Sequence, residues 1–163
     1  MSKTILSLGS NMGNKGMNLS LAIRSIENGA GKVIGKSLVY ETGAWGFDCN
    51  DNFFNQVVMI ETDLSPRSLM DFCLETERRL GRERKLKGQY ESRLIDIDIL
   101  FYSDLVINDE DLKIPHPLLH QRRFVLEPLC EIVPLMVHPV LGITITELLR
   151  QCPDNGLVKK AKS

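Results

Sequence analysis

The segment Arg93-Leu-Ile-Asp-Ile-Asp-Ile-Leu-Phe101 alternates apolar and acidic side chains over most of its length. Alternation with a period of two is typical of a β-strand, whose successive side chains point to opposite faces of the sheet. We therefore expect a strand over residues 94–101, with Asp96 and Asp98 on one face. The apolar face would carry Ile95, Ile97, Ile99 and Phe101.

The chain before this strand contains three further segments with strand character. They are the apolar segment 4–8, the loosely alternating segment 33–42 and the aromatic and β-branched segment 53–62. Runs of this length and composition, bounded by Gly, Asn, Asp and Ser, favour strands.

Helices are expected between and after these strands. A first helix follows strand 4–8 and ends at Asn28-Gly29, with an apolar face formed by Leu19, Ala22, Ile23 and Ile26. Ser65 as N-cap and Pro66 at the first helical position start a second helix, which Gly81 ends. Shorter helices are predicted at 124–132 and 146–151.

The order β-α-β-β-α-β predicts an α+β fold of the split βαβ, or ferredoxin-like, type. Such a fold has an antiparallel sheet with both long helices on one face, here with C-terminal additions. We expect the other face to be open to a ligand. The 163 residues fit a single domain, 1–158, followed by a basic and disordered tail, 159–163.

Composition excludes several classes of protein. A net charge of −1 leaves no overall basic surface for nucleic acid or an anionic membrane. The four cysteines form no CxxC pair, which excludes a zinc knuckle and a redox dithiol. No apolar run approaches the roughly 20 residues that span a bilayer. We expect a soluble, cytoplasmic protein with reduced thiols.

Asp96 and Asp98 are the first candidate functional pair. Two residues of strand separate their Cα atoms by roughly 6.7 Å, so both carboxylates can approach the same cations. Two like charges on one strand face repel each other unless a cation lies between them. Carboxylate oxygens suit Mg²⁺, which completes its coordination with water and substrate phosphates. An ordinary solvent-facing edge strand is the alternative explanation.

A basic segment precedes the aspartates. Residues 78–93 contain seven Lys or Arg and two Glu, a net charge of +5. Such a run is often only a solvated surface. Because this one ends beside two candidate metal ligands, and because arginine binds phosphate oxygens bidentately, it favours a polyphosphate site.

Other phosphate and metal motifs are absent or weak. The chain has neither a GxxxxGK[ST] loop nor a GxGxxG fingerprint. His116 and His120 have a spacing that can hold zinc on a helix, but Pro115 and Pro117 disfavour a helix there. We interpret His116 as a hydrogen-bond donor to phosphate, with a plain turn residue as the alternative.

Taken together, these motifs resemble those of the 6-hydroxymethyl-7,8-dihydropterin pyrophosphokinases. These are folate-pathway enzymes that transfer diphosphate from ATP to a reduced pterin alcohol. The resemblance extends over nearly the whole chain. It rests on an ordered set of motifs: Leu8-Gly9-Ser10-Asn11, the Arg93 to Asp98 signature, Pro115-His116 and Arg122-Arg123-Phe124.

The resemblance implies a role for each matching residue. Asp96 and Asp98 would hold two Mg²⁺ ions and, with Arg82 and Arg93, form the catalytic set. Four residues would bind ATP: Glu77, Arg84, His116 and Arg122. Phe53 and Phe124 would stack on the faces of the pterin, and Asn55 would hydrogen-bond its edge. Thr42, Trp45 and the backbone of 43–46 would complete the pocket. For both phenylalanines, ordinary core packing is the alternative.

The chain departs from the family pattern in two loops. Tyr90-Glu91-Ser92-Arg93 replaces an aromatic-Gly-Pro/Ala-Arg turn, and the loop after Thr42 carries Trp45 in place of the usual prolines. These changes affect the shape of the loops at 43–52 and 82–92, which we interpret as lids that exclude water.

Two other functions are compatible with parts of the sequence. The same strand order occurs in RNA-binding modules, but an aromatic RNA-binding strand is missing and two acidic residues occupy a strand. Another Mg²⁺-dependent phosphoryl or nucleotidyl transferase on this scaffold is the second alternative. The expected partners are ATP and the pterin alone, with no nucleic acid and no membrane, and the protein is expected to be a monomer or a weak dimer.

Overall fold

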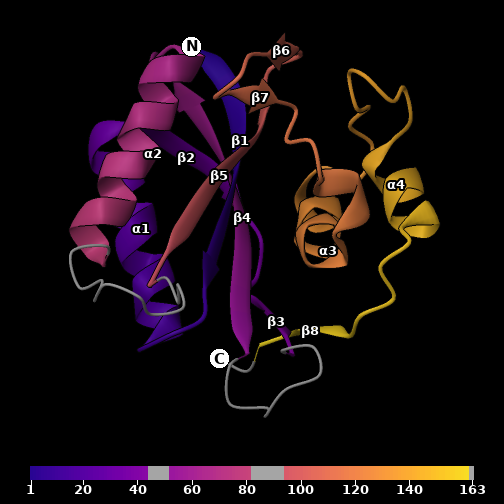
Figure 1. Cartoon of the computed structure of the whole chain (residues 1–163), viewed down its shortest axis with the longest axis horizontal. Helices are drawn as coiled ribbons and strands as arrows, with labels where there is room; N and C mark the ends of the chain where they lie inside the picture. The colour runs from indigo at the N-terminus through magenta and orange to yellow at the C-terminus, as the bar shows by residue number, and fades with distance from the viewer. Residues whose placement is uncertain (44–51, 82–93, 162–163) are drawn as a thin grey trace.

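The computed structural model describes residues 1–43, 52–81 and 94–161. Its elements are, in chain order, β1 (Ser2–Ser10), α1 (Lys15–Gly29), β2 (Gly31–Lys36), β3 (Tyr40–Thr42), β4 (Phe53–Thr62), α2 (Pro66–Leu80), β5 (Asp96–Tyr102), β6 (Ile107–Asn108), β7 (Lys113–Ile114), a 3₁₀ turn (Leu119–Gln121), α3 (Arg123–Ile132), α4 (Ile145–Gln151) and β8 (Val158–Lys160) (Figure 1). The predicted strand 53–62 and helix 66–80 are confirmed. Among these elements, no helix is long and apolar enough to cross a membrane.

The main sheet is antiparallel, with the order β5-β1-β4-β3-β8 and with β2 also paired to β4. β1 lies between β4 and β5, so Gly9 is the partner of Asn55 on one side and of Asp96 on the other. This arrangement brings three segments that are far apart in sequence into one cross-strand row. The predicted α+β, ferredoxin-like architecture is confirmed.

Local capping explains where the long helices begin. The Asn14 side chain accepts a hydrogen bond from the Met17 N–H at 3.1 Å, and the Ser65 hydroxyl accepts one from the Ser68 N–H at 3.2 Å. Each cap satisfies an N–H that has no partner within the helix, which typically stabilises a helix by about 1 kcal/mol.

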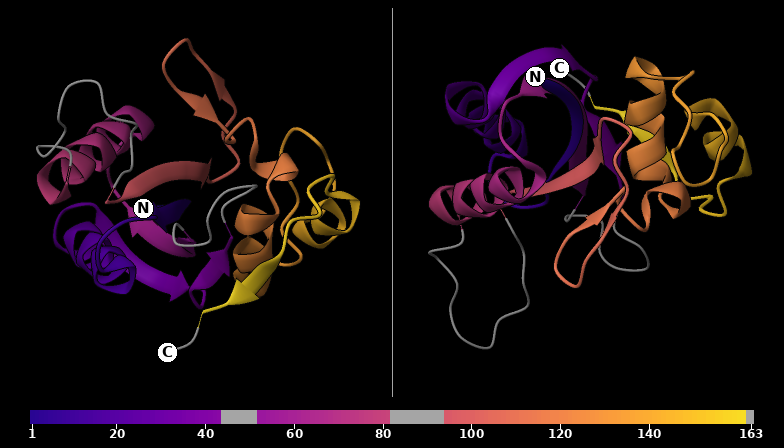
Figure 2. Two further views of the ribbon diagram at one scale, coloured as in Figure 1. Left: turned by 60° about the horizontal axis from the view of Figure 1, so that its bottom comes forward. Right: turned by 90° about the horizontal axis from the view of Figure 1, so that it is seen from above.

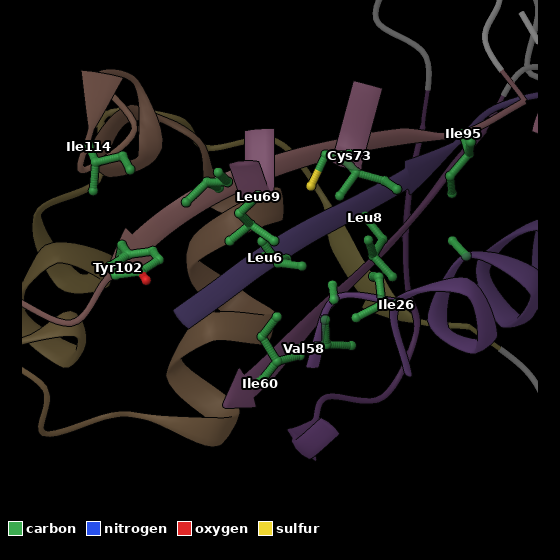
Figure 3. Packing of buried hydrophobic residues seen from close by; sticks show 14 of the residues in the cluster. Leu6, Leu8, Ile26, Val58, Ile60, Leu69, Cys73, Ile95, Tyr102 and Ile114 are labelled. Carbon is green, nitrogen blue, oxygen red and sulfur yellow. The ribbon is translucent and has the colours of Figure 1, made fainter. Parts of the chain in front are cut away.

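α1 and α2 cover one face of the sheet, as predicted (Figure 2). Figure 3 shows this core, in which side chains of both helices interlock with those of the strands. Its members include Leu6, Leu8, Ile26, Val58, Ile60, Leu69, Cys73, Ile95, Tyr102 and Ile114. Burial of each aliphatic side chain contributes about 1.5–3 kcal/mol before the entropy of folding is counted.

The opposite face is only partly open, which corrects the expectation from the sequence. α3 and α4 pack over a second buried cluster that includes Ile5, Val57, Phe101, Leu126 and Leu148 (Figure 1). The helices cover one end of the face because the strands carry apolar side chains there. The other end carries small and polar residues and lines a cavity.

The predicted placement of Phe101 is wrong. Leu6 pairs with Ile99 but the adjacent Ile5 pairs with Phe101, so Leu100 is an extra residue in β5. A β-bulge of this kind inserts one residue and reverses the facing of those beyond it. Phe101 therefore packs in the second cluster, and Tyr102 packs in the first.

The expected strand 33–42 and the expected disordered tail also differ from the structure. Lys36 pairs with Val58 and Tyr40 pairs with Asn55, so an irregular step divides the segment into β2 and β3. Residues 158–160 are not disordered but form β8 along the outer edge of β3. The Ala161 N–H extends this pairing with a 2.8 Å bond to the Val39 carbonyl. An exposed strand edge offers such unpaired backbone groups.

Candidate active site

A cavity of about 770 Å³ lies on the sheet face opposite α1 and α2. Its floor comes from β1, β4 and β5, and the small residues Ser7 and Gly9 of the central strand leave the floor recessed. Its walls come from β3, from the start of α3 and from the segment before β8. With His116, which follows β7, the cavity thus collects residues from seven separate parts of the chain.

Eight of the predicted site residues line this one cavity. They are Thr42, Phe53, Asn55, Asp96, Asp98, His116, Arg122 and Phe124. Four others, Trp45, Arg82, Arg84 and Arg93, lie outside the described residues, as do the whole of the predicted lid 82–92 and residues 44–51 of the predicted lid 43–52. Glu77 does not line the cavity.

Asp96 and Asp98 are on the cavity face of β5, as the alternation predicts. The side chain of Asp98 is exposed and that of Asp96 is half-buried. Within the described parts of the chain, no three potential ligands from His, Cys, Asp and Glu converge. Two carboxylates with access to a large cavity nevertheless suit Mg²⁺, which takes its remaining oxygens from water and phosphate.

His116 lines the same cavity and interacts electrostatically with both Asp98 and Arg122. The Leu118 N–H donates to His116 Nδ1 at 3.1 Å, so the proton of the neutral ring is on Nε2. Burial lowers the pKa of His116, with Asp98 acting in the opposite direction and Arg122 in the same direction. A neutral ring with an Nε2 proton can donate a hydrogen bond to a phosphate oxygen. Its Nδ1 is already occupied by a backbone N–H, which disfavours the zinc alternative.

Asn55 and Thr42 form the polar part of the cavity at the end opposite Asp96 and Asp98. Asn55 is 6% exposed, and its Nδ2 donates to Thr42 Oγ1 at 3.5 Å. Phe53, 39% exposed, lies next to Thr42 in the pairing of β3 with β4. A buried amide and a half-buried hydroxyl beside an exposed aromatic ring suit a flat, hydrogen-bonding heterocycle.

Phe124 and Arg122 enter the cavity from the start of α3. The Arg122 guanidinium lies over the Phe124 ring, 5.7 Å from its centroid. Phe124 also packs against the second buried cluster. Its ring therefore combines core packing, the alternative set against stacking, with access to the cavity.

Glu77 supports the backbone that carries the aspartates. Its Oε2 accepts a 2.6 Å hydrogen bond from the N–H of Ile97, the residue between Asp96 and Asp98. The carboxylate is 5% exposed and lines a separate hollow of about 340 Å³, which shares Asp98 and His116 with the main cavity. Nearby, burial, Glu77 and Asp98 raise the pKa of the Cys73 thiol to about 12.

Sequence reasoning missed one wall of the cavity, formed by Asp154, Gly156, Leu157 and Val158. Asp-Asn-Gly at 154–156 is typical of a turn. That signal predicts where the chain bends, and it does not predict which distant element the bend contacts.

The model of the family described as 7,8-dihydro-6-hydroxymethylpterin-pyrophosphokinase (HPPK) matches residues 5–134. The chain belongs to this family. It transfers the pyrophosphoryl group of ATP to 6-hydroxymethyl-7,8-dihydropterin in folate biosynthesis, as the resemblance implied.

Individual relatives agree with HPPK membership over nearly the full length. The 2-amino-4-hydroxy-6-hydroxymethyldihydropteridine pyrophosphokinase of Methylorubrum extorquens is 38% identical over 158 residues, covering 96% of this chain and 98% of that protein. The pyrophosphokinase of the same name from Aquifex aeolicus is 40% identical over 157 residues, covering 96% and 94%.

The HPPK fold is also seen in a solved structure of a longer protein. The Plasmodium falciparum HPPK-DHPS A437G chain superposes with a TM-score of 0.77 at 20% identity. The match covers 92% of this chain and 45% of that one, so this chain spans less than half of the solved protein. At this identity the likeness bears on the fold alone.

Proposed function

We propose that the 770 Å³ cavity binds both substrates, with the pterin at the Asn55 end and the ATP phosphates at the aspartate end. The observation that carries this proposal is the row in which Gly9 separates Asn55 from Asp96. A polar, aromatic-lined end and an acidic end are thereby held on one rigid sheet face.

Asn55 would recognise the pterin by hydrogen bonding, and the aromatic residues near Asn55 would stack on the ring. The Asn55 amide offers both a donor and an acceptor to the mixed edge of the pterin ring. Phe53 and Phe124 would stack on the ring, and Thr42 and the backbone at Gly43 would close the pocket. Trp45 would belong to the same pocket.

Asp96 and Asp98 would hold two Mg²⁺ ions bound together with ATP. HPPK enzymes are generally Mg²⁺-dependent, and the two carboxylates provide the hard oxygen donors that this ion prefers. When bound, the ions would neutralise negative charge on the phosphates.

The protein's own donors would position the phosphates. His116 and Arg122 line the cavity together with Asp98, and Asp98 and Arg122 both act electrostatically on His116. Arg82, Arg84 and Arg93 would complete the set of residues that bind the ATP phosphates. Of these, Arg82 and Arg93 would act on the pyrophosphoryl group as it is transferred. The smaller hollow bordered by Glu77 joins the site at Asp98 and suits the nucleoside of ATP.

The reaction would proceed by in-line attack. The pterin hydroxyl oxygen forms a bond to the β-phosphorus of ATP, and the bond from that phosphorus to the α,β-bridging oxygen breaks. AMP leaves with the bridging oxygen, and the hydroxyl proton is lost to solvent. Catalysis of this kind depends on positioning and on charge stabilisation.

Product analysis tests the proposal. The protein, incubated with ATP, Mg²⁺ and the reduced pterin alcohol, should form AMP and the pterin diphosphate in equal amounts. ADP or pyrophosphate as product would indicate the alternative transferase chemistry, and no product would contradict the placement of both substrates. Analytical sedimentation at the assay concentration measures the oligomeric state and so tests the expected monomer or weak dimer. The cytoplasmic location stays a prediction.

A further inference from the structure

The segment 154–158 supplies four lining residues of the cavity and lies beyond the 5–134 range that the family model matches. We propose that Asp154 and Arg123 act as positioning residues, which fix the start of α3 so that Arg122 and Phe124 face the substrates. This inference rests on the proposed function of the cavity.

Asp154 and Arg123 are joined by two hydrogen bonds, both donated by Arg123. The Arg123 N–H donates to Asp154 Oδ2 at 3.1 Å, and Arg123 Nε donates to the Asp154 carbonyl at 2.8 Å. The second carboxylate oxygen, Oδ1, accepts the Gly156 N–H at 2.8 Å. A single carboxylate therefore organises both its own turn and a helix that begins 31 residues earlier.

The contact replaces a missing helix cap. Arg122 occupies the N-cap position of α3 and makes no capping hydrogen bond with its own side chain. Asp154 instead satisfies the first helical N–H, and its negative charge lies at the positive end of the helix dipole. Because Arg123 stands between Arg122 and Phe124, fixing its backbone limits the directions of both neighbours.

The wall is anchored at both ends. Arg123 also forms an ion pair with Glu127 in the next turn of α3, at 3.5 Å, with both side chains partly buried. At the far end of the wall, Val158 pairs with Thr42 of β3. Leu157 between these anchors is 77% exposed and lines the cavity, so its position depends on the anchors and not on burial.

Two substitutions and a matched control test the inference. Asp154→Ala removes both carboxylate contacts. Asp154→Asn keeps one amide oxygen, which can serve Arg123 or Gly156 but not both. Glu147→Ala is the control because Glu147 bonds Arg150 and Gln151 within α4 and does not line the cavity. Pterin affinity is titrated in the presence of a non-hydrolysable ATP analogue, well below the unfolding temperature of each variant.

We expect Asp154→Ala to weaken pterin binding about tenfold, the size of effect that loss of a helix cap can produce. Asp154→Asn should fall between Asp154→Ala and wild type, and Glu147→Ala should bind pterin as wild type does. Unchanged affinity in Asp154→Ala, or an equal loss in Glu147→Ala, would overturn the positioning role while leaving the proposed function intact. A wild-type protein that bound no pterin would overturn both.

Discussion

Asn55 and Asp96 are separated by a single residue, Gly9, in a cross-strand row of the sheet. Two strand spacings place their Cα atoms roughly 9.5 Å apart. A bicyclic ring carrying a hydroxymethyl group can bridge such a distance. The proposed pterin end of the cavity and the proposed metal and phosphate end are thus fixed relative to each other by backbone hydrogen bonds.

Gly9→Ala tests the spacing within this row. A Cβ at this position would lie 3.2 Å from Asn55 Oδ1, closer than most real contacts, so the amide must shift. We expect pterin affinity to fall about tenfold, as a misplaced buried hydrogen bond would cause. ATP affinity should stay near wild type when both ligands are titrated calorimetrically.

Gly35→Ala is the matched control, since its Cβ would meet only Met59 Cβ at an ordinary 3.9 Å. Equal losses of pterin affinity in the two variants would show that the effect comes from strand stability and not from the position of Asn55.

Asn55→Asp examines recognition of the ring edge. The substitution keeps the size of the side chain and replaces its NH₂ donors with acceptors. An unpaired buried partner costs roughly 1–3 kcal/mol, so pterin affinity should fall about tenfold to over a hundredfold. Titration of each ligand separates the outcomes: equal losses for ATP and pterin would mean that Asn55 supports the fold, and full pterin binding would place the pocket elsewhere.

Asp96→Ala and Asp98→Ala should each reduce turnover at least about 100-fold, the scale on which loss of charge stabilisation acts. Both side chains lie on the cavity face, so thermal unfolding should change little. Exposed Asp104 provides the control, and Asp104→Ala should turn over normally. Near-normal product formation in either site variant would remove the two-metal interpretation, and a sharp drop in unfolding temperature would assign the aspartates to the fold.

His138 links stability to pH. Its Nδ1 accepts the N–H groups of Val140 and Leu141 at 3.1 and 3.0 Å, and a protonated ring cannot accept them. Burial, and to a lesser extent His120, lowers the pKa of His138 in the folded protein. The stabilising contribution is therefore fully present above the unfolded pKa of about 6.5 and is lost as the pH falls toward the folded value.

The pH prediction is measured by chemical denaturation of wild type and His138→Asn between pH 7.5 and 5. Wild type should lose free energy of unfolding more steeply below about pH 6.5 than the variant does, because Asn cannot titrate. Parallel curves would show that His138 contributes nothing to the acid sensitivity.

Local patterns in the sequence were enough for the helices and for the faces of single strands. Ser65, Pro66 and Gly81 define α2 because capping depends on neighbouring residues. The side chains of Asp96 and Asp98 share a face because strand alternation is a property of the backbone. The family motifs added the chemistry of these residues, which spacing alone left open.

The tertiary structure decided what depends on a partner strand or helix. Leu100 becomes a bulge, and Phe101 changes face, through the register of β5 against β1, which the sequence of β5 does not contain. In the same way, the turn at 154–156 is visible locally, but its contact with Arg123 is made across 31 residues and is selected by the packing of α3 against the sheet. Local propensity acts over one or two turns of chain, so long-range contacts of this kind were settled only when the whole chain packed together.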